Sequence, residues 1–264
     1  MKNLAYIILL AIALLLPSCA ADSSGELSDP GSAGAEVLSG SYANMLTIGD
    51  KLYVLGNGQL KTLSLANPEN PEEINAIDIS FDIESLFIAN GTVFVGSPDG
   101  MFIYTLDGEG IPQFRSQTPY EIIEELQPCD PIVANSDFAF ATLSTSIEVN
   151  NDCWRTVSLN ELRVFDLENL ELPVLINTVP MTQPKGVGLD GDHLFVCENT
   201  DGLRILDVSD PVNIEELEHF PGFAAYDVIP ANGLLLVVGP KVLHQYDYTN
   251  INDVTKLSSF ELQD

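Results

Sequence analysis

Short apolar runs separated by turn residues follow one another along most of the chain after residue 40. They are rich in β-branched and aromatic residues and open with Gly-Asp, Asn-Gly or Ser-Asp pairs, a composition typical of strands joined by tight hairpins. One such strand is expected in each of five ranges, 49–54, 90–95, 136–141, 191–196 and 232–237. No window has a long helical period. The pattern therefore predicts an all-β protein.

A second strand, ending in a short polar residue, follows each of these at a regular distance. Its last residue is Ser64, Thr105, Asp166, Asp207 or Asp247, at intervals of 41, 61, 41 and 40 residues. A turn rich in Asn, Asp and Pro comes next. Four antiparallel strands every 40 residues or so are typical of a β-propeller blade. We predict a β-propeller of five four-stranded blades in residues 41–264, since a two-sheet sandwich, the alternative, would not explain the constant period.

The copy at 203–211, with the sequence LRILDVSDP, is closest to a known repeat. The pattern of the repeats, Gly, then Leu-x-Ile/Val-aromatic-Asp and then Asp-Pro, resembles that of the LVIVD-repeat family, β-propeller lipoproteins of Bacteroidetes-type bacteria. The likeness extends over residues 41–262, and the first two repeats depart from it, with Ser64 and Thr105 in place of Asp. The resemblance implies the fold and a place in the cell envelope, and it brings no established activity.

The N-terminus has a different pattern. Lys2 precedes an apolar run at 4–16, which is too short to span a membrane and is typical of a secretory signal peptide. The run ends in the tetrapeptide LPSC at 16–19, which resembles the bacterial lipobox. We therefore predict that residues 1–18 are removed and that Cys19 is lipidated, which would attach the protein to a membrane. Ordinary secretion is the alternative.

Residues 19–40 are mostly Ser, Gly, Ala, Asp and Glu, so a flexible tether is predicted there. The predicted location is the cell envelope, on the outer membrane, facing either the periplasm or the outside.

The charge narrows the choice of partners. Ten Lys+Arg stand against 39 Asp+Glu, a formal net charge of −29. Such a surface repels phosphate backbones, which argues against nucleic acid as a partner. No oligomerisation element is visible, so a monomer is expected. An assembly scaffold that its charge keeps soluble is one further interpretation.

Propellers usually bind partners at the mouth of the central channel, near the starts of the innermost strands. Alignment on the Gly-Asp turn places five candidates there: Glu84, Asp130, Lys185, Tyr226 and Asp227. Convergent carboxylates can hold a cation or the hydroxyls of a sugar, although they can also be a solvated rim. Because an ammonium group would compete with calcium, we predict a site for a protein or glycan and no metal.

A catalytic site has less support in the sequence. His193, His219 and His244 are expected within strands, and no phosphate-binding loop is present. The prediction is therefore a non-catalytic binding module without a cofactor. The alternative is a glycan-cleaving enzyme that uses Glu84, Asp130 and Asp227, an analogy of architecture with other five-bladed propellers.

The third repeat carries an insertion around 144–159, interpreted as a long loop that presents Trp154. An exposed Trp often contacts sugars or proteins, but this one could instead pack onto the blade. Cys129 and Cys153 are expected on one face of the same blade, where a disulfide is plausible. Cys197 is expected to be buried, and its pairing with either of the other two is the alternative.

Overall fold

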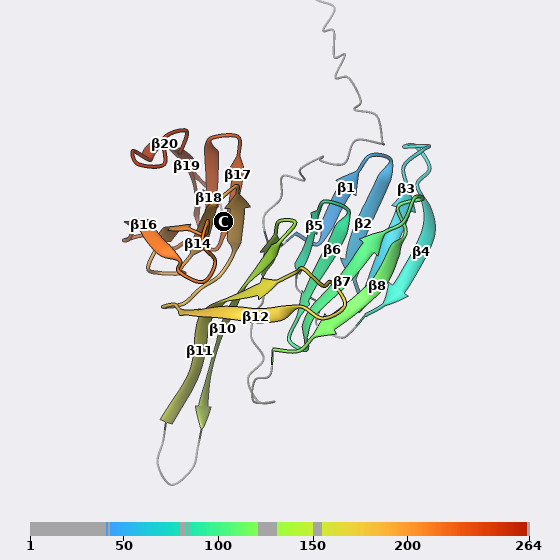
Figure 1. Cartoon of the computed structure of the whole chain (residues 1–264). Helices are drawn as coiled ribbons and strands as arrows, with labels where there is room; N and C mark the ends of the chain where they lie inside the picture. The colour runs from blue at the N-terminus through green and yellow to red at the C-terminus, as the bar shows by residue number, and fades with distance from the viewer. Residues whose placement is uncertain are drawn as a thin grey trace, which may run out of the picture. The chain divides into compact units, whose positions relative to one another are not determined.

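The computed structural model describes residues 41, 43–79, 83, 85–120, 131–149 and 155–262, without the side chains of 146–149 and 155–157. These residues form twenty strands in five sheets (Figure 1). In chain order the strands are β1 (Met45–Ile48), β2 (Lys51–Gly56), β3 (Gln59–Ser64), β4 (Glu72–Asp78), β5 (Ser85–Ala89), β6 (Thr92–Ser97), β7 (Gly100–Leu106), β8 (Pro112–Thr118), β9 (Ile132–Ala134), β10 (Phe138–Val149), β11 (Arg155–Asp166), β12 (Val174–Pro180), β13 (Val187–Asp190), β14 (His193–Cys197), β15 (Leu203–Asp207), β16 (Glu215–Phe220), β17 (Asp227–Ala231), β18 (Leu234–Val238), β19 (Val242–Asp247) and β20 (Thr255–Glu261). The described residues include no helix able to cross a membrane.

Each sheet consists of four consecutive antiparallel strands, here called A to D in chain order. The five sheets are the blades of a five-bladed β-propeller, as predicted, and are numbered 1 to 5 along the chain. The pairing of strands C and D shifts register once in every blade. The shifts fall at 62/63, 103/104, 164/165, 205/206 and 245/246. A bulge at the same repeat position in all five blades shows that the sequence period is a structural period.

The A–B turns follow from the residues predicted to form them. In blade 2, Asn90 and Gly91 have φ values of 49° and 74°; in blade 5, Asn232 and Gly233 have 51° and 86°. Positive φ at both central residues is the geometry of a two-residue type I′ hairpin, which Asn-Gly favours. These turns close β5–β6 and β17–β18, so the local sequence sets the register of both pairs.

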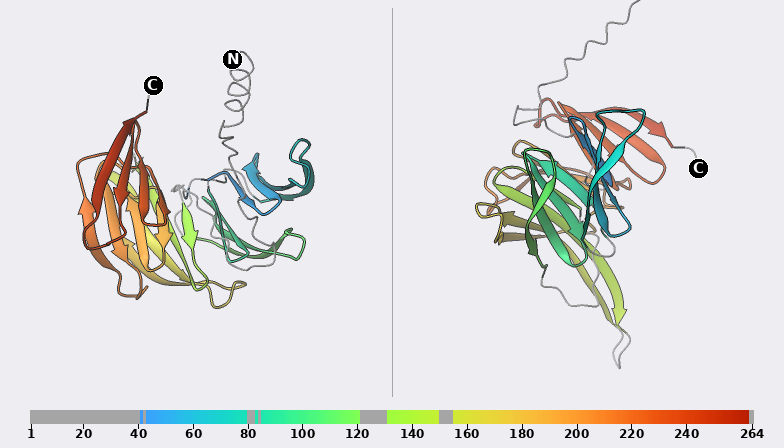
Figure 2. Two further views of the ribbon diagram at one scale, coloured as in Figure 1. Left: turned by 90° about the horizontal axis from the view of Figure 1, so that it is seen from above. Right: turned by 90° about the vertical axis from the view of Figure 1, so that its right-hand side faces the viewer.

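The hydrophobic core lies between consecutive blades. Four buried clusters join blades 1 and 2, 2 and 3, 3 and 4, and 4 and 5. Between blades 4 and 5, for example, Phe195 and Ile205 pack with Val228, Leu235 and Val237, all fully buried. Figure 2 shows the sheets that these clusters connect. Since side chains alternate along a strand, each central blade buries residues on both faces.

The insertion of blade 3 is not the long loop that was expected. Strands β10 and β11 have 12 residues each, and their pairing continues to Val149 opposite Arg155. The extra residues therefore lengthen a hairpin, which projects beyond the neighbouring strands (Figures 1 and 2). The alternation of Thr, Ser, Ile and Val at 142–149 is compatible with this strand.

The Asp residues that end the C strands stabilise turns, as the pattern suggested. Oδ1 accepts the N–H of the residue two positions later, at 2.7 Å for Asp166 and 2.9 Å for both Asp207 and Asp247. The Ser64 hydroxyl does the same at 3.3 Å. Thr105 differs, because its hydroxyl accepts a hydrogen bond from a side chain on β8. The repeated Asp is therefore structural in the three blades that carry it.

Candidate functional site

The predicted channel-mouth residues are described only in part. Lys185, Tyr226 and Asp227 are described, and they lie within two residues of the start of the A strands of blades 4 and 5, as predicted. The residues that lie outside the described part of the chain are Cys19, Glu84, Cys129, Asp130, Cys153 and Trp154. Their predicted roles in lipidation, ligand binding and a disulfide therefore stay predictions.

Backbone hydrogen bonds bring the starts of these two A strands together. The N–H of Gly186 donates to the carbonyl oxygen of Tyr226 at 2.8 Å, and the N–H of Lys185 donates to that of Cys197 at 2.7 Å. The Thr142 hydroxyl, in blade 3, donates to the carbonyl of Lys185 at 2.6 Å. The mouth segments of blades 3, 4 and 5 are thereby joined. The side chain of Tyr226 remains 42% exposed beside them.

The carboxylate of Asp227 accepts hydrogen bonds from the segment that leads into blade 1. Its Oδ1 accepts the N–H of Ser41 at 3.3 Å, the Ser41 hydroxyl at 3.1 Å and its own strand's Val228 N–H at 2.9 Å. The same Ser41 hydroxyl accepts the N–H of Val187 at 2.8 Å, and Ser41 is fully buried. Ser41 therefore connects blades 4 and 5. Two residues later, the carbonyl of Ala43 accepts an N–H from blade 2 at 3.0 Å.

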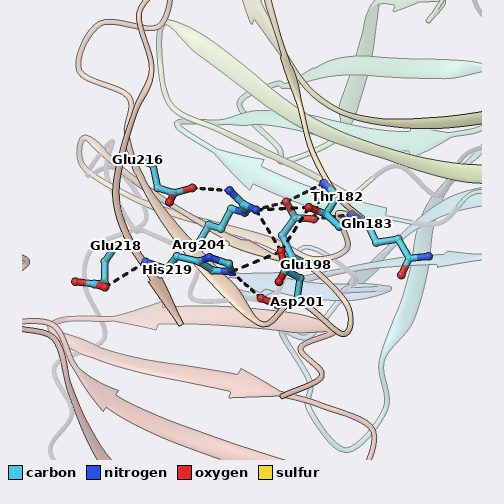
Figure 3. A network of polar contacts seen from close by, with 8 residues as sticks. All are labelled: Thr182, Gln183, Glu198, Asp201, Arg204, Glu216, Glu218 and His219. Carbon is cyan, nitrogen blue, oxygen red and sulfur yellow. Dashed lines mark hydrogen bonds and ion pairs between the residues drawn. The ribbon is translucent and has the colours of Figure 1, made fainter. Parts of the chain in front are cut away.

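A polar network in blade 4 adjoins the mouth (Figure 3). At its centre is Glu198, which follows strand β14 and is fully buried. Its carboxylate accepts the N–H of Gln183 at 2.6 Å and that of Thr182 at 3.1 Å. The amide of Asn199 donates to Oε1 of Gln183 at 2.7 Å. These bonds fasten the loop between blades 3 and 4 to the B–C turn of blade 4.

Arg204, on strand β15, balances the charge of this network. Its guanidinium lies 3.2 Å from Oε1 of Glu198, 3.2 Å from Oδ2 of Asp201 and 2.5 Å from Oε2 of Glu216. Partial burial would lower the pKa of Arg204, but the Glu216 hydrogen bond and the nearby carboxylates outweigh it and raise the pKa. His219 completes the group, with Nε2 at 2.8 Å from the carbonyl oxygen of Asp201. These hydrogen bonds and ion pairs hold the side chains of the network in fixed positions on blade 4.

This network was not predicted from the sequence, although the repeat carried a signal for it. Arg204 is the second residue of the repeated segment 203–207, and blades 1 and 3 have Lys61 and Arg163 at the same repeat position. Both also contact carboxylates, Lys61 with Glu73 at 2.8 Å and Arg163 with Glu161 at 2.5 Å. A basic residue at this repeat position therefore indicates a pair with an acidic residue on the same blade.

The described residues contain no group of His, Cys, Asp and Glu able to hold a metal ion. Cys197 is a free, buried thiol, so the alternative in which it forms a disulfide is wrong. Burial, together with the nearby carboxylates of Asp227 and Glu198, raises the pKa of this thiol well above its ordinary value. The expectation of a small buried residue at this position is confirmed.

Comparisons with known proteins show the fold. The sequence matches no protein-family model and no curated protein. Among solved structures, a functionally unknown protein from Desulfotomaculum acetoxidans has a TM-score of 0.62 at 13% identity, over 86% of this chain and 72% of that one. The periplasmic gluconolactonase PpgL of Pseudomonas aeruginosa has 0.57 at 17%, over 81% and 68%. Citrobacter koseri AztD has 0.54 at 13%, over 81% and 61%.

This chain is similar to β-propellers. At such identities the likeness concerns the fold alone, and the similar structures have varied or unknown functions. Membership of the LVIVD-repeat family stays a prediction.

Proposed function

We propose that the protein is a non-catalytic binding module whose partner, a protein or a glycan, contacts the mouth face formed by the D–A and B–C loops. The observation that carries the proposal is that Tyr226 is 42% exposed while its backbone is held by hydrogen bonds to Gly186 of blade 4 and Val238 of blade 5. Tyrosine is enriched at the centres of binding surfaces because it offers a large contact area and a polar tip. A rigid support lowers the entropy cost of binding.

The contacts of Asp227 favour binding over catalysis. A general acid or base must exchange a proton with its substrate. Oδ1 of Asp227 instead accepts three hydrogen bonds from Ser41 and Val228, all of which stabilise the fold. The glycan-cleaving alternative with Glu84 and Asp130 has no comparable support among the described residues.

The proposed location follows from the N-terminal sequence. Lipidation of Cys19 would attach the chain to the outer membrane through the predicted tether at 19–40. In cells carrying Cys19→Ala, we expect labelled palmitate to be absent from the protein and the chain to leave the membrane fraction. Retention of the label in this variant would contradict the proposal.

Site-specific photo-cross-linking tests the mouth face. A photoreactive phenylalanine analogue replaces Tyr226 in the full chain, in its native cells. The matched control carries the same analogue at Leu217, on the outer strand β16, where the native side chain is 38% exposed. We expect adducts of a defined protein or glycan from position 226 and none from position 217. Equal adducts from both positions, or none from 226, would refute the assignment of the mouth face.

The enzymatic alternative has its own experiment. The full chain is incubated with a panel of plant, host and bacterial glycans, beside Asp227→Asn. Hydrolysis that the variant loses would overturn the non-catalytic proposal. Cross-linking without hydrolysis is the expected result.

A further inference from the structure

One position of the repeat differs in blade 5. In all five blades, the residue that follows the repeat position of Ser64, Thr105, Asp166, Asp207 and Asp247 donates its N–H to a carbonyl of the A–B turn, at 2.7 to 2.9 Å. The residues at this position are Leu65, Leu106, Leu167, Val208 and Tyr248. Four are aliphatic and three of these are leucine, so an aliphatic side chain is sufficient for the fold at this position. Tyr248 places a hydroxyl where the other four blades have none.

A second difference lies opposite the first. The residue before each A–B turn is Ile48, Ala89, Asn135, Asp190 or Ala231. Only blade 4 has a charged residue there, and the Tyr248 hydroxyl donates to Oδ2 of Asp190 at 2.7 Å. The Tyr248 ring is 6% exposed and stands edge-on to Phe195, with centroids 5.0 Å apart. The two departures from the repeat thus form one fixed polar contact between blades 4 and 5.

A pocket of about 440 Å³ that is open to solvent, called the cavity below, adjoins this contact. It lies at the end of the strands formed by the A–B and C–D turns, opposite the mouth. Its lining residues are Asp190, His193, Asn232, Gly233, Tyr248, Thr249 and Ile251. The volume falls within the range of roughly 300–1,000 Å³ that is usual for small-molecule sites.

The chemistry of the lining narrows the class of ligand. Asp190 is a hydrogen-bond acceptor, Asn232 both donates and accepts, and His193 does so when neutral. Carboxylates nearby disfavour an anion: Asp207 is paired across the strands with His193, and Asp247 accepts the hydroxyl of Thr249 at 2.6 Å. The lining thus combines hydrogen-bond donors and acceptors with the aliphatic side chain of Ile251. It is suited to a ligand with hydroxyl groups, which both donate and accept hydrogen bonds.

We propose that this cavity binds a saccharide unit, at a site separate from the mouth face. Oδ1 of Asp190 would accept ligand hydroxyls while Tyr248 holds the carboxylate in place. Because the site lies at the other end of the strands, it stands or falls independently of the proposed mouth function.

Saturation-transfer NMR with the full chain, in a detergent without a sugar head group, tests this proposal. The probes are glucose, galactose, xylose, N-acetylglucosamine, maltose and cellobiose, with putrescine as a cation that contacts carboxylates without sugar chemistry. We expect at least one sugar to bind and putrescine to give no signal. Asp190→Ala and Tyr248→Leu introduce residues that other blades already carry. Each should weaken binding about tenfold or more, the effect of losing a hydrogen bond to a charged group.

One control places the effect. Asp137→Ala removes a charge from the A–B turn of blade 3 and should bind sugar as the unchanged chain does. Circular dichroism verifies folding, and Tyr248→Phe keeps the ring if Tyr248→Leu does not fold. The proposal is overturned if no sugar binds, if only putrescine binds, or if the Asp190 and Tyr248 variants bind normally. Equal weakening by Asp137→Ala would also overturn it.

Discussion

Replacing Glu198 by Ala should lower the free energy of unfolding by about 3 kcal/mol. The fully buried carboxylate accepts N–H groups from Gln183 at 2.6 Å and Thr182 at 3.1 Å, and pairs with Arg204 at 3.2 Å. Hydrogen bonds to charged groups contribute roughly 1.5–3 kcal/mol each. Since the two loop residues are exposed and Arg204 is 25% exposed, water can replace part of what is lost. The expected value therefore lies at the lower end of the sum for two bonds.

Glu216→Ala is the matched control. It removes a carboxylate from the same guanidinium, at the shorter distance of 2.5 Å, but the Glu216 side chain is 42% exposed. Exposed ion pairs contribute roughly 0–1 kcal/mol because water screens them. The longer, buried contact of Glu198 should therefore stabilise the protein more than the shorter, exposed one.

Urea unfolding followed by far-ultraviolet circular dichroism measures both variants. The slope of the free energy against urea should stay unchanged while the midpoint falls for Glu198→Ala. In thermal unfolding, a loss of about 3 kcal/mol corresponds to a Tm lower by roughly 6–12 °C for a domain of this size. If Glu216→Ala lowers the free energy of unfolding as much as Glu198→Ala does, the distance between the charges and not their burial determines the stabilisation, and the reasoning is refuted.

Three further changes have definite outcomes. Ser41→Ala should lower the unfolding free energy by about 1–3 kcal/mol in urea titrations, because it leaves the carboxylate of Asp227 and a backbone N–H without a partner hydroxyl; an unchanged midpoint would contradict this. Cys197 should resist iodoacetamide in the native protein and react after unfolding, as peptide mass spectrometry would show, since burial raises its pKa. The Thr249 hydroxyl and N–H lower the pKa of Asp247 below 3.8. The contribution of ionised Asp247 to the free energy of unfolding is therefore complete above pH 3.8 and is lost as the pH falls through the lowered pKa. The difference in urea midpoint between the unchanged chain and Asp247→Ala should accordingly be constant near neutral pH and shrink in acid.

Features of the fold that depend on neighbours in sequence could be predicted from the chain. The Asn90-Gly91 turn and the Asp at 166, 207 and 247 act through bonds to residues at most a few positions away, so their pattern is sufficient. The constant spacing of those Asp residues then implies blades with the same arrangement of four strands. The β10–β11 hairpin was misjudged because the blade length expected from the other repeats made its extra residues look like a loop.

Features that depend on contacts between repeats could not be predicted in the same way. Glu198 meets Thr182 and Gln183 only because the B–C turn and the preceding loop converge after folding. Asp190 and Tyr248 each stand out from their repeat position, but 58 residues separate them, and only the packing of blade 5 on blade 4 shows that they touch. The sequence also gave no reason to connect Ser41 with Asp227, which are 186 residues apart.

The place where the chain joins the fold also bears on which face of a tethered propeller would lie nearer the membrane. Ser41 enters among the starts of β13 and β17, on the mouth side. A tether of about 20 residues, as predicted for 19–40, has a root-mean-square span of roughly 25 Å. Tension on a lipid at Cys19 would therefore act first on the bonds of Ser41 with blades 4 and 5 and would draw the mouth towards the bilayer. A partner at the mouth would have to fit into the space under the propeller, while the cavity between blades 4 and 5 would open away from the membrane.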